Sequence, residues 1–68
     1  MDNWQKVFSD GSPVRAEIVK SVLEENGIPA VVMNKIESVY RIHGQYDVMV
    51  PQVEFSKALN IVKNEISF

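Results

Sequence analysis

The sequence predicts an α+β fold in which two amphipathic helices lie on one face of a small, mostly antiparallel sheet. Two segments carry apolar residues at helical spacing, and shorter segments alternate or are continuously apolar, as strands are. Glycine and proline stand at the boundaries between these segments. With 68 residues the chain is expected to form a single domain, residues 1–68, near the lower limit for independent folding.

Residues 4–8 are the first strand candidate. Trp4, Lys6 and Phe8 alternate with the residues between them, which predicts that these three share one face. Because a lysine stands between two aromatic residues, we expect that face to be incompletely buried. Residues 9–12 then form the connecting loop.

A helix over residues 13–26 has the clearest start and stop signals. Ser12 is a good N-cap, and Pro13 follows at the first helical position, where its missing N–H costs nothing. Gly27 can adopt the left-handed conformation that often ends a helix, and Pro29 prevents the helix from resuming. One broad apolar side is predicted to contain Val14, Ala16, Ile18, Val19, Val22 and Leu23.

Further strands and a second helix follow. Residues 28–34 predict a strand that is apolar on both faces, and residues 46–50 predict another, which Pro51 ends. Residues 39–42 alternate weakly and could pair back on residues 28–34 as a hairpin. The second helix is expected to begin at residue 52 or 53. Its apolar stripe comprises Phe55, Ala58, Leu59, Val62 and Ile66.

This order, β-α-β-(β)-β-α, predicts a truncated ferredoxin-like two-layer sandwich. The closing strand of a ferredoxin-like unit is absent, so an edge of the first strand is expected to be exposed. The sheet face away from the helices is expected to carry the apolar side chains of Val31, Met33 and Met49. We therefore expect a homodimer that forms through this edge or face, with Trp4 among its interface residues.

The charge pattern argues against nucleic-acid binding. Seven basic and nine acidic residues are interspersed and give a net charge of −2, which offers no basic surface. The chain has no cysteine, so it has neither disulfides nor a thiolate metal site. We find no signal-peptide pattern and no apolar run near the roughly 20 residues that span a bilayer. A cytoplasmic location without membrane association is the expectation.

Several of these segments together resemble a known family. They are residues 12–30, with their helix ending in Glu-Asn-Gly-Ile-Pro-Ala, the run Tyr-Asp-Val-Met-Val-Pro at 46–51, and Lys57-Ala58-Leu59 in the second helix. They are similar to a family of small bacterial domains labelled "putative prokaryotic signal transducing protein". The resemblance covers nearly the whole chain. It implies a fold like that of the GlnB-like branch of the ferredoxin-like proteins, and a signalling or regulatory role. Residues 34–45 are shorter than the effector loop of GlnB-like proteins.

The loop before the first helix is the candidate ligand site. Gly11 and Ser12 could present backbone N–H groups to a phosphate or carboxylate, and the guanidinium of Arg15 could reach the same anion. The alternative interpretation is a turn with an N-cap, in which Arg15 lies over the core with its head in water. Asp10 adds a charge that would repel an anion.

No catalytic motif can be assembled from the remaining residues. His43 is the only histidine, and no clustered carboxylates accompany it, so we interpret it as a solvated loop residue and assign no metal and no cofactor. Trp4, Tyr40 and Tyr46 could stack on bases, but without a basic groove we favour packing in the core or a dimer. We do not expect an enzyme.

The leading functional prediction is a small regulatory module that binds another protein or itself. The alternative is a sensor of a small anionic metabolite or nucleotide. Such a ligand would lie near Gly11, Ser12 and Arg15, against residues 35–41.

Overall fold

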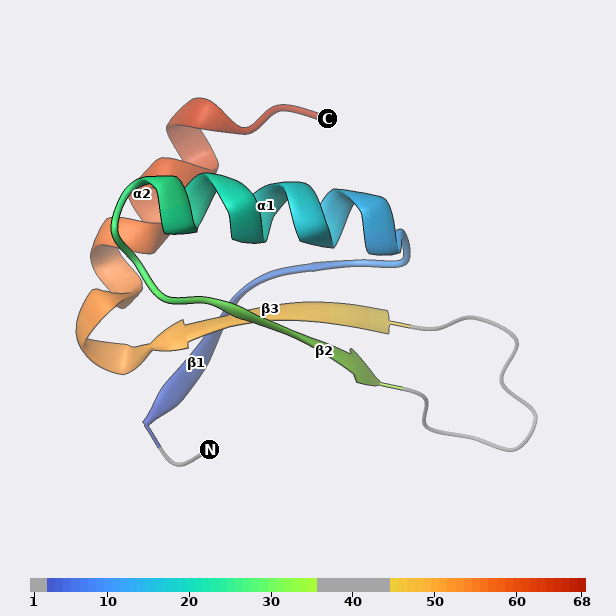
Figure 1. The fold of residues 1–68 in the computed structure, drawn as a ribbon, viewed down its shortest axis with the longest axis horizontal. Helices are drawn as coiled ribbons and strands as arrows, with labels where there is room; N and C mark the ends of the chain where they lie inside the picture. The colour runs from blue at the N-terminus through green and yellow to red at the C-terminus, as the bar shows by residue number, and fades with distance from the viewer. Residues whose placement is uncertain (1–2, 36–44) are drawn as a thin grey trace.

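A computed structural model describes residues 3–35 and 45–68 of the chain. Both helices lie on the same side of the sheet (Figure 1). This is the predicted α+β architecture, compatible with a truncated ferredoxin-like sandwich. The strand expected at residues 39–42 lies outside the described residues. The elements in chain order are β1 (Trp4–Asp10), α1 (Pro13–Glu25), β2 (Val31–Lys35), β3 (Gln45–Pro51), the 3-10 turn η1 (Gln52–Glu54) and α2 (Phe55–Glu65).

The three strands are ordered β1-β3-β2, and both neighbours pair antiparallel with β3. Consequently β1 and β2 run parallel to each other, and α1 is the connection that crosses over β3 between them. Val48 of β3 pairs with Val32 of β2 on one side and with Phe8 of β1 on the other. The central strand therefore has no free edge, whereas β1 and β2 each have one within the described sheet.

A β-bulge interrupts β1. Lys6 pairs with Met49 and Phe8 pairs with Val48, so Val7 is an extra residue on its strand. Because of this insertion Val7 and Phe8 both pack against the core under the helices. The alternation expected from the sequence therefore ends at the bulge, and Phe8 does not share a face with Lys6.

Helix α1 begins and ends where the sequence predicted. The Ser12 hydroxyl accepts a hydrogen bond from the backbone N–H of Arg15 at 3.3 Å, which makes Ser12 the N-cap. At the other end Gly27 has φ 81°, and its N–H donates to the carbonyl oxygen of Glu24. The N–H of Ile28 donates to the carbonyl oxygen of Leu23 at 3.0 Å, which completes a Schellman motif.

The later boundaries differ slightly from the prediction. Strand β2 begins at Val31 rather than at Ile28, because Ile28 completes the helix stop and its side chain is fully buried. The second helix begins as the turn η1 at Gln52 before the α-helix starts at Phe55.

The core lies between the helices and the sheet. Val48 and Val50 of β3 are completely buried, and so are Val19 and Leu23 of α1. Helix α2 contributes Ile61, which the predicted apolar stripe had omitted. The buried apolar residues are Val7, Ala16, Val19, Leu23, Ile28, Ala30, Val48, Val50, Ala58 and Ile61.

The apolar side of α1 is narrower than predicted. Val14 is 65% exposed and Ile18 is 44% exposed, although both were expected on the buried side. At 100° per residue Val14 lies opposite the buried stripe of α1, and Ile18 lies well away from it. The sheet and α2 cover only part of the apolar arc, so these two side chains remain on the surface.

Replacing a core residue of α1 should cost far more stability than replacing its exposed neighbour. Leu23→Ala is expected to lower the free energy of unfolding by about 2–5 kcal/mol, because the cavity it leaves cannot fully collapse. Ile18→Ala should lower it by less than about 1 kcal/mol. Urea unfolding of both variants measures the difference. Equal losses would mean that α1 packs with a different face toward the sheet.

Candidate functional site

The start of α1 brings the predicted ligand residues together around a carboxylate of the chain itself. Oδ1 of Asp10 accepts a hydrogen bond from the backbone N–H of Ser12 at 2.8 Å. Oδ2 of Asp10 lies 3.5 Å from Nη1 of Arg15. Gly11 lies in the bend between them and is exposed. Asp10 therefore engages the N–H of Ser12 and the guanidinium, two groups that would have held an external anion.

This arrangement caps a helix and leaves little room for an anionic ligand. A phosphate or carboxylate at this position would have to displace Asp10 or lie beside its negative charge. The ion pair is open to solvent, with the Arg15 side chain 50% exposed, so it contributes little to stability. The cluster is best explained as the N-cap that the alternative interpretation described.

Arg15 has a second partner that the sequence did not reveal. Its Cζ atom lies 5.1 Å from the centre of the Phe68 ring, within the range of a cation–π contact. The Phe68 ring also packs against Phe8, with the ring centres 5.9 Å apart. The C-terminal residues thus run back over α1 (Figure 1) and join the end of β1 to the first turn of the helix.

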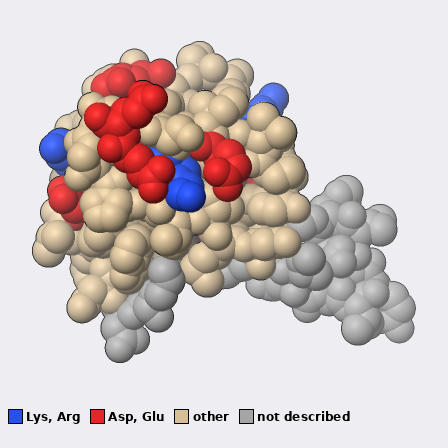
Figure 2. Space-filling view, in the orientation of Figure 1, with Lys and Arg blue, Asp and Glu red and all other residues tan. Residues whose placement is uncertain are grey.

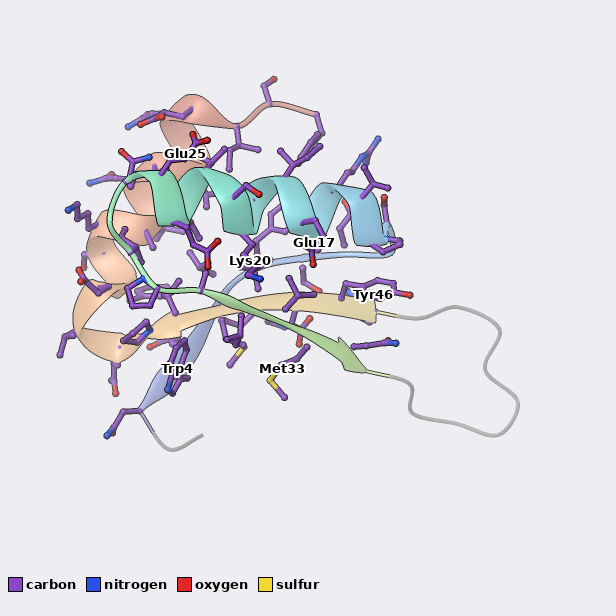
Figure 3. The ribbon with its side chains drawn as sticks, in the orientation of Figure 1. Trp4, Glu17, Lys20, Glu25, Met33 and Tyr46 are labelled. Atoms are coloured by element: carbon purple, nitrogen blue, oxygen red, sulfur yellow. The ribbon has the colours of Figure 1, made fainter. Side chains whose placement is uncertain are left out.

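The face of the sheet opposite the helices collects the four residues that the sequence proposed as an interface. Val31 pairs with Met49, and Met33 lies two residues further along β2 on the same face. Trp4 pairs with Pro51, which shares this face with Met49. Figure 3 shows Trp4 and Met33 on the side of the sheet away from α1. We call the surface formed by Trp4, Val31, Met33 and Met49 the open face.

The open face is apolar from the end at Trp4 and Pro51 to its centre, and polar at the other end. Met33 is 38% exposed, and the other three apolar residues are half-buried. Lys6 pairs with Met49 at the β1 edge and is exposed. Next along the sheet, Ser9 Oγ donates to Asp47 Oδ1 at 2.7 Å, and the Gln45 amide donates to the same hydroxyl. Asp47 is only 2% exposed.

Sequence reasoning missed this polar group of Ser9, Gln45 and Asp47. Ser9 and Asp47 are 38 residues apart in the chain. Their pairing depends on the register of β1 and β3 beyond the bulge, for which the local sequence contains no signal.

A pocket of about 520 Å³ adjoins the apolar end of the open face. It is lined by Asn3, Pro51, Gln52 and Val53. The backbone N–H of Gln52 donates to the carbonyl oxygen of Asn3 at 2.6 Å, which ties the start of β1 to η1. Pro51 belongs to both the pocket and the paired end of β3, so the two surfaces are continuous.

Other sequence candidates do not add to this site. Tyr46 packs against the core, while Tyr40 and His43 lie outside the described residues. Among residues 3–35 and 45–68, no three histidine, cysteine, aspartate or glutamate side chains are grouped so that they could hold a metal ion. No helix in this described part is both long and apolar enough to cross a membrane.

The two roles of Asp10 can be separated by two substitutions. Asp10→Asn keeps an oxygen acceptor for the Ser12 N–H and loses only the charge, so it should lower the free energy of unfolding by less than about 1 kcal/mol. Asp10→Ala also removes the acceptor and should cost about 1 kcal/mol more. Urea unfolding at low salt measures both. If both variants matched the wild type, Asp10 would not be part of the cap.

Comparison with protein-family models gives a match over nearly the whole chain. The family described as "Putative prokaryotic signal transducing protein" matches residues 4–66, which include every strand and helix described above. No curated protein and no solved structure matches the chain.

Proposed function

Because the chain belongs to the family of putative prokaryotic signal transducing proteins, we propose that it is a small, non-catalytic domain that binds proteins and has a regulatory role. The description of the family supports a signalling role and names no ligand or reaction. We propose that the module acts in the cytoplasm as a homodimer. The observation that carries the proposed homodimer is the open face.

The open face supports protein binding because four large apolar side chains lie together on a surface that neither helix covers. Sheets pack face to face at about 10 Å, with side chains from both inner faces filling the space. A second copy of the same three-stranded face has the matching width and chemistry. Its association would take the methionines and Trp4 out of water.

Pairing through the strand edge is less well supported than packing through the face. The β1 edge carries an exposed lysine, Lys6, and a bulge at Val7, and both features protect edges from pairing with other strands. We therefore assign the proposed contact to the open face.

The alternative function is a sensor of an anionic metabolite or nucleotide at Gly11, Ser12 and Arg15. We favour it less because Asp10 already engages Ser12 and Arg15. A thermal-shift screen over nucleotides and common metabolite anions separates the two functions. A ligand at a hundredfold excess over its Kd stabilises its protein by about 2.7 kcal/mol, which would raise the melting temperature clearly. We expect no shift; a reproducible shift that Arg15→Gln abolishes would favour the sensor.

A charge placed on the open face should weaken the homodimer. Met33→Lys is expected to raise the dimer dissociation constant at least about tenfold, because the new ammonium group would lose its water on association. Ile18→Lys is the matched control, since Ile18 has similar exposure but lies on α1. Sedimentation equilibrium measures both. A wild-type protein that stays monomeric at micromolar concentration would contradict the homodimer.

A further inference from the structure

A second apolar surface lies on the helical side of the molecule. Val14, Ile18 and Phe68 are 65%, 44% and 56% exposed. Val14 and Ile18 are one helical turn apart, on the part of α1 turned away from the sheet. The Phe68 ring contacts the guanidinium of Arg15, which lies between Val14 and Ile18 in the chain. We call these three residues the helix patch.

The patch is held in place by the fold. The Phe68 ring packs against both Arg15 and Phe8, so its position is tied to the first turn of α1 and to β1. Helix α1 is capped at both ends, by Ser12 and by the Schellman motif at Gly27. A partner would therefore meet apolar side chains whose backbone is already ordered, which lowers the entropy cost of binding.

The surface beside the patch is acidic. Glu17, Glu24 and Glu25 are exposed on α1 and have one lysine, Lys20, among them. Figure 2 shows acidic side chains over α1 on both sides of a basic one, and Figure 3 locates Glu17, Lys20 and Glu25 along the helix. The charge of Arg15 is offset by Asp10. Anionic membranes and nucleic acids would be repelled, and so would the same acidic surface of another copy.

We propose that the helix patch docks a basic amphipathic helix of a partner protein. Apolar residues of that helix at positions i, i+3 or i+4, and i+7 would cover Val14, Ile18 and Phe68. Its lysine or arginine residues would face the glutamates of α1. A helix fits better than a strand because the patch follows one turn of α1, which offers ridges for packing but no free backbone groups.

This inference rests on the proposed interaction role and names the kind of partner that would be regulated. Helix α1, which carries Val14 and Ile18 of the helix patch, lies on one side of the sheet (Figure 1), and the open face is the other side of that sheet. A homodimer formed through the open face would therefore leave two helix patches free, and partner binding would not compete with self-association.

The test uses a model peptide that forms a helix with leucines along one side and lysines along the other. Amide resonances of the isotope-labelled full chain are followed during titration. We expect shifts at the exposed positions of α1 and at Phe68, and weaker binding at higher salt. Val14→Ser should raise the peptide Kd about tenfold by removing apolar area buried in the complex. Val53→Ser, the same change at a side chain 92% exposed outside the patch, should leave it unchanged.

Several results would overturn the inference. They are equal Kd values for the two serine variants, shifts confined to the open face, equal binding of a peptide with glutamates in place of lysines, and no binding at all. Circular dichroism checks that Val14→Ser folds, and Ile18→Gln provides a second variant of the patch. Sedimentation of the same samples tests the homodimer separately, so that either proposal can fail without the other.

Discussion

The packing of α1 on the central strand β3 is the contact on which the rest of the structure depends. Val48 and Val50 are completely buried under the helices, in the same cluster as Val19 and Leu23, and Val48 pairs with a strand on each side. Because α1 crosses over β3 to join β1 and β2, this contact also fixes the strand order. Both helices cover the same face of the sheet, and the opposite face is left for solvent or for another molecule.

Local signals predicted the limits of α1 well because they act over a few residues. Ser12, Gly27 and Ile28 each make the backbone contact expected of them, and these contacts need no knowledge of the remaining fold. The apolar width of α1 was overestimated because periodicity shows which side chains are apolar but not how far the neighbouring layer extends. Val14 and Ile18 lie beyond that extent.

The candidate sites could also be predicted only in part, where they depend on residues close together in the chain. The proximity of Gly11, Ser12 and Arg15 follows from the sequence, because they lie within five residues of one another. The position of the Asp10 carboxylate beside Ser12 depends instead on the path of β1. Alternation in β2 and β3 placed Val31, Met33 and Met49 on one face correctly. The contact of Phe68 with Arg15 joins distant parts of the chain and has no local signature. The kinship with GlnB-like regulators stays a prediction.

The bulge at Val7 has a consequence for how this fold tolerates change. Successive side chains of a strand point to alternate faces, so an extra residue would exchange the faces of all that follow it unless a bulge takes it out of the ladder. Here the bulge takes up Val7, and Ser9 pairs with Asp47 while Asp10 lies at the first turn of α1. The position of the Asp10 carboxylate in the helix cap therefore depends on the bulge as well as on the residues of the cap. Deletion of Val7 would leave Lys6 and Phe8 as regular neighbours with Ser9 and Asp10 on their present faces, and its cost would be the buried side chain of Val7.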